Sequence, residues 1–245
     1  SSTSRGLGDV YKRQPLKQHL TDLSEKVLST GADFGIAVDP DVDRLAFMDE
    51  KGELFGEEYT LVACADYVLS HTKGNTVSNL SSTRALCDVT VKHGGTYTAS
   101  AVGEVNVVAA MKANNAIIGG EGNGGIILPE SHYGRDALVG IALFLSLLAE
   151  KQMSVSTLKN TYPLYFMSKK KIDLNPNIDV DALLSAMEKS YQNEPLTTVD
   201  GVKIDFPDSW VHLRKSNTEP IIRIYTEAPT QQQADALAAV SYTHL

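Results

Sequence analysis

The sequence has few cysteines, no basic excess and no long apolar run, and each of these absences excludes a class of protein. Cys64 and Cys87 are the only cysteines among 245 residues, too few for a disulfide scaffold or a cysteine-rich zinc site. Lys and Arg number 22 against 30 Asp and Glu, a net charge of −8, which disfavours a general nucleic-acid binder. Apolar runs fall short of the ~20 residues that span a membrane, and no stretch has the layout of a signal peptide. We therefore expect a cytoplasmic protein that binds neither nucleic acid nor membrane.

The composition is that of a chain able to bury a core, with 42% hydrophobic and 21% charged residues. Residues 1–14 have no apolar periodicity, and residues 241–245 interrupt a helical pattern without a cap. We expect both ends to be non-native flanking sequence, so that the native chain begins and ends within a longer protein.

Residues 15–162 alternate between short apolar runs and helical patterns. The run at 34–38 predicts a buried strand, and Asp136 is a plausible N-cap for a strongly apolar helix. Further strands are expected at 75–80, 96–100 and 116–120, and helices at 16–31, 61–69, 84–93, 105–113 and 136–150. This alternation indicates an α/β domain with layered helices and a mixed, largely parallel sheet.

The pattern changes near residue 162. One strand (164–174) and one amphipathic helix (180–191) are followed by three strands within 200–228 and a final helix from residue 230. This order predicts a small α+β domain with an antiparallel sheet.

A first polar loop follows the strand at 34–38. Asp39, Asp41 and Asp43 stand at alternate positions before Arg44, and three such carboxylates can converge on a hard cation such as Mg²⁺. A solvated acidic turn is the alternative. An EF-hand is disfavoured, because Arg44 stands where that loop needs glycine.

A second loop, residues 119–125, reads Gly-Gly-Glu-Gly-Asn-Gly-Gly. Glycines allow close backbone approach, and Glu121 with Asn123 suits hydroxyl recognition. It fits neither a dinucleotide-binding nor a Walker fingerprint. A merely flexible turn is the alternative.

A third loop, residues 214–220, combines one guanidinium with hydroxyls and an amide, and a second guanidinium follows it. Arg214, Ser216, Asn217, Thr218 and the nearby Arg223 form a donor-rich cluster suited to phosphate. An ordinary polar turn is the alternative. Together the three loops predict a site for a divalent cation, a polyhydroxyl ligand and a phosphate, which points to a phosphorylated sugar.

The motifs DPDVDR, GEGNGG and RKSNTEP, in this order, resemble the α-D-phosphohexomutase superfamily. The resemblance covers residues 15–240 and implies the end of a metal-loop domain (15–52), a sugar-recognition domain (53–162) and a phosphate-binding domain (163–240). It also implies an upstream domain with a phosphoserine loop, which does not occur here. We therefore expect this part of the enzyme to be inactive alone.

The resemblance implies a role for each loop. Mg²⁺ would be bound by Asp39, Asp41 and Asp43, and Arg44 would be catalytic, holding the substrate or the seryl phosphate. Sugar hydroxyls would be bound by Glu121 and Asn123. The phosphate that is not transferred would be held by Arg214, Ser216, Asn217, Thr218 and Arg223.

The implied reaction moves a phosphoryl group between C1 and C6 of a hexose phosphate through a bisphosphate intermediate. The loop variant favours a phosphoglucosamine mutase, with phosphomannomutase or phosphoglucomutase as the alternative. Four residues near the loops have open roles: Ser81, Glu104, His132 and Arg135. Two other classes stay open, a non-catalytic phosphosugar-binding module and a Mg²⁺-dependent phosphotransferase with an aspartate nucleophile.

Overall fold

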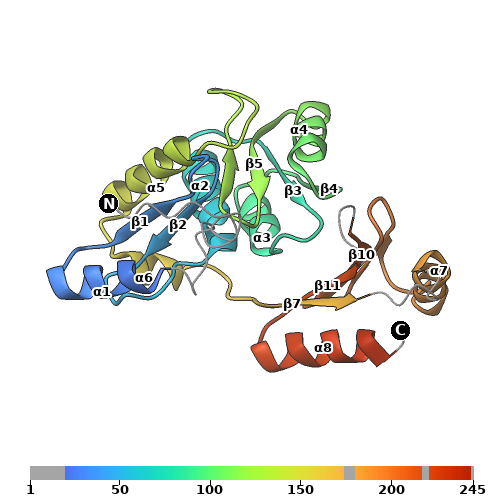
Figure 1. Ribbon diagram of the computed structural model, residues 1–245. Coiled ribbons are helices and arrows are strands. Elements are labelled where there is room, and N and C mark those ends of the chain that lie inside the picture. Colours follow the sequence, from blue (N-terminus) through green and yellow to red (C-terminus); the bar gives the residue numbers. More distant parts are fainter. Residues whose placement is uncertain (1–19, 174–179, 217–220, 244–245) are drawn as a thin grey trace. The chain divides into compact units, whose positions relative to one another are not determined.

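The computed structural model describes residues 20–173, 180–216 and 221–243 (Figure 1). The chain divides into two units, Ser1–Pro163 and Leu164–Leu245, which are described separately. Within the described residues no helix has both the length and the apolar character needed to cross a bilayer. An α/β unit with a mixed sheet is followed by a small unit with an antiparallel sheet, which confirms the predicted fold class.

The N-terminal unit begins with a helix and a hairpin. Helix α1 (Thr21–Thr30) ends at Gly31, whose left-handed conformation closes the helix. Strands β1 (Gly35–Val38) and β2 (Leu45–Met48) pair antiparallel, so residues 39–44 form the loop between them. The prediction of a buried strand is wrong for one face of β1: among the described residues, Ile36 and Val38 are 36% and 42% exposed.

The main sheet of this unit has four strands in the order β4-β3-β5-β6. The first three are parallel and β6 is antiparallel to β5. Its strands are β3 (Asn75–Asn79), β4 (Tyr97–Ser100), β5 (Ala116–Glu121) and β6 (Gly125–Ile127). Its helices are α2 (Glu57–His71), α3 (Ala85–Lys92), α4 (Glu104–Ala113), α5 (Ala137–Lys151) and α6 (Val155–Lys159). Asp136 caps α5 as predicted, since its carboxylate accepts the N–H groups of Leu138 and Val139.

The hairpin is packed onto this sheet domain by aromatic rings. Phe47 of β2 stacks on Phe144 of α5 with ring centroids 3.7 Å apart, and Phe55 meets Phe144 edge-on at 5.0 Å. All three side chains are fully buried. This contact fixes the start of β2, and with it the acidic loop, against the rest of the unit.

The C-terminal unit is an antiparallel sheet in the order β7-β11-β10-β9-β8. Its strands are β7 (Phe166–Asp173), β8 (Leu196–Thr197), β9 (Val202–Asp205), β10 (Trp210–Lys215) and β11 (Ile221–Ala228). Helices α7 (Val180–Ser190) and α8 (Gln231–Thr243) contribute to a core on one face with Leu213, Ile222 and Ile224. Because side chains alternate along strands, Arg214 and Arg223 lie on the opposite face.

His212 makes the stability of this unit depend on pH. Its side chain is buried, and Nε2 lies 2.6 Å from the carbonyl oxygen of Asp200. Burial lowers the pKa of His212 from 6.5 to about 4, so the neutral ring is favoured in the folded state. Stability is therefore complete above pH 6.5 and is lost progressively as pH falls from 6.5 towards 4.

We expect His212→Gln, which keeps a donor for Asp200, to flatten the dependence of unfolding free energy on pH in this window. Urea denaturation of the chain at a series of pH values measures it. The matched control is His71→Gln, which replaces an exposed histidine and leaves His212 in place, so the loss of stability between pH 6.5 and 4 should remain. A wild-type slope in His212→Gln would contradict the assignment.

Candidate functional site

The predicted sugar loop lies where the parallel sheet changes direction. The chain goes from β3 to its neighbour β4, and then to β5 on the other side of β3. Ligands of open α/β sheets bind at the carboxyl ends of strands at such a switch point. Asn79 ends β3 and Glu121 ends β5, so the two side chains meet there.

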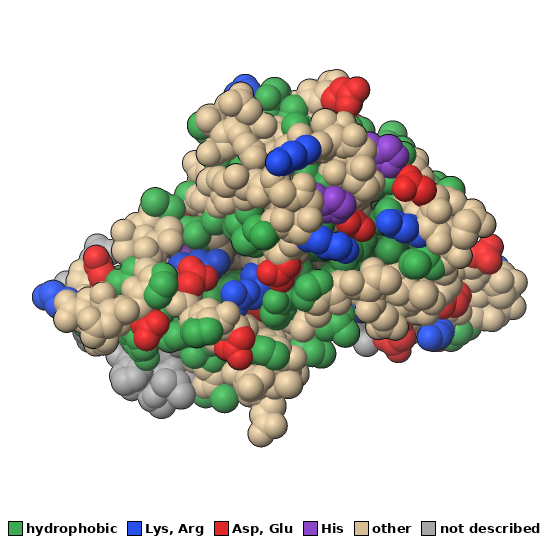
Figure 2. Space-filling view, turned by 180° about the vertical axis from the view of Figure 1, so that it is seen from behind, with side chains coloured by type: hydrophobic (Ala, Val, Ile, Leu, Met, Phe, Trp, Pro, Cys, Tyr) green, Lys and Arg blue, Asp and Glu red, His purple; other side chains and the backbone are tan. Residues whose placement is uncertain are grey.

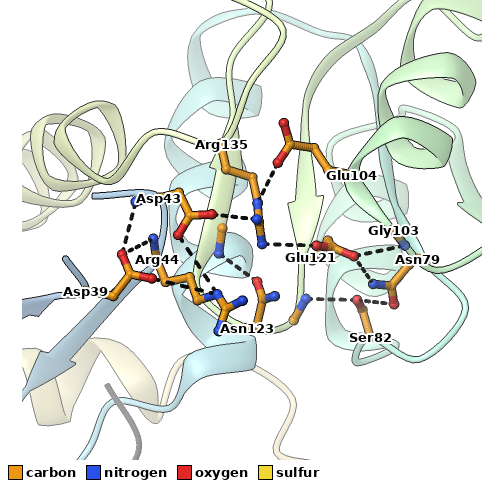
Figure 3. A network of polar contacts seen from close by, with 12 residues as sticks. Asp39, Asp43, Arg44, Asn79, Ser82, Gly103, Glu104, Glu121, Asn123 and Arg135 are labelled. Atoms are coloured by element: carbon orange, nitrogen blue, oxygen red, sulfur yellow. Dashed lines mark hydrogen bonds and ion pairs between the residues drawn. The ribbon is translucent and has the colours of Figure 1, made fainter. Parts of the chain in front are cut away.

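Glu121 is almost fully buried, and protein donors hold its carboxylate. Oε1 accepts Nδ2 of Asn79 at 2.9 Å and the N–H of Gly103 at 3.2 Å. Oε2 accepts Nη1 of Arg135 at 3.3 Å. A carboxylate oxygen can accept more than one bond, so Oε2 can still take a ligand hydroxyl. The side chain of Glu121 is therefore held in one orientation by these three donors (Figure 3).

The glycines after Glu121 shape the loop around close contacts. The N–H of Gly122 donates to Oγ of Ser82 at 3.0 Å. Oδ1 of Asn123 accepts the N–H of Gly125 at 3.2 Å, which leaves its NH₂ as the group suited to donate to a ligand. The carbonyl of Gly124 accepts the N–H of Leu45 at 3.2 Å, so the sugar loop is bonded to the first residue of β2.

Gly124 cannot be replaced without moving backbone. Its φ is +83°, and a Cβ there would lie 2.1 Å from the carbonyl oxygen of Leu45. We expect Gly124→Ala to lower the free energy of unfolding by at least about 1 kcal/mol more than Gly31→Ala does. Gly31 has φ +63° with nothing near its Cβ, so it isolates the cost of backbone conformation. Chemical denaturation measures both, and equal losses would contradict the steric argument.

The acidic loop is organised around Asp39. This carboxylate is 7% exposed, and Oδ1 accepts the N–H groups of Asp43 at 3.1 Å and Arg44 at 3.2 Å. Nε of Arg44 lies 3.9 Å from both Oδ2 of Asp39 and Oδ1 of Asp43. Val42 takes a left-handed φ of +57°, which lets the chain turn back on itself.

The carboxylates of Asp39 and Asp43 lie close enough to perturb each other. Burial and then contact with the Asp39 side chain raise the pKa of Asp43, while Arg135 opposes the increase. Two like charges held together suit a cation, which would relieve their repulsion. Asp41 is exposed, and across the described residues no three acidic, His or Cys side chains form a ready-made metal cluster. The Asp39–Asp43 pair nevertheless has the oxygen donors that Mg²⁺ prefers.

Arg135 joins the acidic loop to the sugar loop, a role that sequence reasoning left open. Nη2 lies 2.5 Å from Oδ2 of Asp43, and Nε lies 2.7 Å from Oε2 of Glu104. Its Nη1 reaches Glu121, as described above. Asp43 and Glu121 thus share one guanidinium, and the predicted metal and sugar loops form a single network (Figure 3).

The other three residues whose roles the sequence left undecided lie in different parts of the N-terminal unit. Glu104 is the first residue of α4 and faces Arg135. Nε2 of His132 lies 2.9 Å from Oδ2 of Asp136, at the start of α5. Ser81 is buried, and its N–H donates to Oδ1 of Asn79 at 2.9 Å. Asn79 and Ser82 were not predicted as site residues. Their segment, Asn-Leu-Ser-Ser-Thr at 79–83, lies at the end of a predicted strand, and that position could have indicated them.

In the C-terminal unit three of the predicted phosphate-binding residues lie on or next to strands β10 and β11: Arg214, Ser216 and Arg223. Arg214 and Arg223 are direct partners across the two strands, and Lys171 of β7 is the partner of Arg223. Ser216 is buried, and its N–H donates to the carbonyl of Ile221 at 3.0 Å. Asn217 and Thr218 lie outside the described residues.

Side chains of directly opposed strand residues share one face, so three cationic side chains line up across this sheet. Nε of Arg214 is buried and has no hydrogen-bond partner among the described residues. Like charges directly opposite one another in a sheet repel, and an anion bound at this row would offset that repulsion. On the face seen in Figure 2, positive and negative side chains are interspersed.

Three family descriptions match consecutive parts of the chain. Residues 5–52 match "Phosphoglucomutase/phosphomannomutase, alpha/beta/alpha domain II", residues 56–165 match its domain III, and residues 173–242 match its C-terminal domain. Together they cover most of the 245 residues.

Curated relatives and a solved structure from the same family are also similar to this chain. A phosphoglucomutase/phosphomannomutase of Thermococcus kodakarensis is 35% identical over 90% of this chain and 49% of its own length. A probable phosphoglucosamine mutase of Methanopyrus kandleri is 31% identical over 91% of this chain and 50% of its own. The crystal structure of a family protein from Burkholderia thailandensis superposes with a TM-score of 0.79 at 26% identity, over 93% of this chain and 50% of its own. The chain thus spans about half the length of the curated relatives it matches.

Proposed function

The chain belongs to the phosphoglucomutase/phosphomannomutase family, and on that premise we propose that it is the C-terminal half of a Mg²⁺-dependent phosphohexomutase. The reaction moves a phosphoryl group between C1 and C6 of a hexose phosphate through a hexose 1,6-bisphosphate. The observation that carries the proposal is the shared network of Asp43, Arg135 and Glu121. It links a cation-binding loop to a hydroxyl-binding loop at the switch point of the sheet.

The chain's own residues would bind both ends of the sugar. Glu121 would accept a ring hydroxyl through Oε2, and Asn123 would donate through its amide. The phosphate that is not transferred would be held by Arg214, Ser216, Asn217, Thr218 and Arg223. Because the bisphosphate must bind in two orientations, this clamp has to recognise either phosphate by charge rather than by the identity of the carbon that carries it.

Asp39, Asp41 and Asp43 would hold Mg²⁺, and Arg44 would hold the phosphoryl oxygens beside it. A bound Mg²⁺ would neutralise charge that builds up on the phosphoryl group. Asp41, which is exposed here, would have to turn towards the other two carboxylates. The phosphoserine that donates and takes back the phosphoryl group would come from the upstream half of the enzyme.

Glucosamine phosphate is the first substrate to test, because the loop variant resembles phosphoglucosamine mutases and the Methanopyrus relative has that name. Mannose and glucose phosphates come second, because the Thermococcus relative is a phosphoglucomutase/phosphomannomutase. The observations favour the enzyme over a non-catalytic sugar-phosphate module, because such a module has no need of a cation loop joined to the sugar loop.

The proposal is tested by recovering the upstream reading frame and assaying the complete protein with Mg²⁺ and each hexose 1-phosphate. We expect interconversion of 1- and 6-phosphates by the complete protein and none by the 245-residue chain alone. An upstream sequence without a phosphoserine loop, in a protein that binds sugar phosphate without turnover, would support the binding module instead.

A further inference from the structure

Arg135 is placed to do more than balance charge. It contacts three carboxylates from three separate segments: Asp43 between β1 and β2, Glu104 at the start of α4, and Glu121 at the end of β5. The side chain of Arg135 is only 15% exposed. Its planar fork presents several N–H groups in fixed directions, so one side chain can serve all three acceptors at once.

The fold makes room for this side chain and fixes its backbone. A Cβ on Gly125 would lie 2.4 Å from Cδ of Arg135, so the stem of the arginine crosses where another residue's side chain would stand. On the C-terminal side, the N–H of Asp136 donates to the carbonyl of Ile126 at 2.8 Å, and the N–H of Ala137 donates to the carbonyl of Val42 at 3.0 Å. The segment is thus bonded to both the sugar-loop strand and the acidic loop.

We propose that Arg135 is a positioning residue that couples the two loops, by orienting Glu121 for the sugar while competing with the divalent cation for Asp43. The inference rests on the proposed function. In the structure Oδ2 of Asp43 is taken by Arg135. A cation that binds Asp43 must weaken this ion pair, and the guanidinium then stays with Glu121 and Glu104.

This arrangement predicts opposite effects on the two ligands. Removing the charge of Arg135 frees Asp43 and removes a positive charge beside the cation, so metal should bind more tightly. Glu121 loses the donor on Oε2 that fixes its orientation, so sugar phosphate should bind more weakly. A residue that only stabilises the fold would weaken both.

The test compares the 245-residue chain with Arg135→Gln, Arg135→Lys and Lys112→Gln. Mn²⁺ affinity is measured by electron paramagnetic resonance of the free ion, and glucosamine 6-phosphate affinity by calorimetry. We expect Arg135→Gln to bind Mn²⁺ about 5-fold more tightly and the sugar phosphate about 5- to 10-fold more weakly. Arg135→Lys keeps the charge without the fork, so it should restore the Mn²⁺ affinity but not the sugar affinity.

Lys112→Gln removes one positive charge from α4, where Lys112 lies over the ring of Tyr133, and should change neither affinity. Parallel loss of both affinities in Arg135→Gln, or no change in either, overturns the inference and leaves the proposed function intact. A wild-type chain that binds neither Mn²⁺ nor the sugar phosphate counts against the proposed function itself.

Discussion

Replacing Asp39 by Asn in the complete enzyme is expected to lower kcat/KM by about 10³-fold, through the loss of one cation ligand. The loop itself should survive, because Oδ1 of Asn can still accept the N–H groups of Asp43 and Arg44 that Asp39 accepts now. The substitution therefore removes the negative charge of the Asp39 side chain and keeps the conformation of the loop. Steady-state kinetics at saturating Mg²⁺ give the activity, and Mn²⁺ titration of the variant should show a matching loss of affinity.

Asp33→Asn is the matched control, because it removes the same charge from an exposed position just before β1. It should leave both kcat/KM and Mn²⁺ affinity unchanged. Wild-type turnover in Asp39→Asn would exclude Asp39 as a ligand. A loss of activity with unchanged Mn²⁺ affinity would instead assign it to shaping the loop around Arg44.

Elements with a strong local signal could be predicted from the sequence. Helix α5 has an apolar pattern and a capping aspartate, and both are properties of neighbouring residues. The strands β6 and β8, with three and two residues, are too short to show a period, so they were missed. The exposure of Ile36 was missed because an apolar run does not say which faces of its strand other elements cover.

In the site, too, features of neighbouring residues could be predicted and contacts between distant segments could not. The loops containing Asp39 and Glu121 could be found because their polar residues are clustered in sequence. The bonds that join them could not, because Asn79 and Glu121 are 42 positions apart, and Arg135 reaches Asp43 across an even longer stretch of chain. A parallel sheet brings such residues together at its carboxyl edge, so knowing the strand order would have placed Asn79 beside Glu121.

Arg223→Gln is expected to weaken binding of hexose phosphate about 10- to 100-fold while leaving the C-terminal unit folded. Arg223 is the direct cross-strand partner of Arg214 on one side and of Lys171 on the other, so its guanidinium lies in a row of positive charge that suits a phosphate. A charge-assisted bond to phosphate contributes about 1.5–3 kcal/mol, which gives the expected loss of affinity. The free energy of unfolding should change by no more than about 1 kcal/mol, because Gln keeps part of the aliphatic stem of Arg223 and a polar end.

Calorimetry with glucosamine 6-phosphate and urea denaturation of the ligand-free chain measure the two effects. Lys170→Gln is the matched control: it removes a positive charge from the next position along β7, which points to the other face of the sheet, and should leave affinity unchanged. A structural role for Arg223 would lower stability and affinity together. A large loss of affinity at nearly unchanged stability would therefore assign Arg223 to the phosphate clamp.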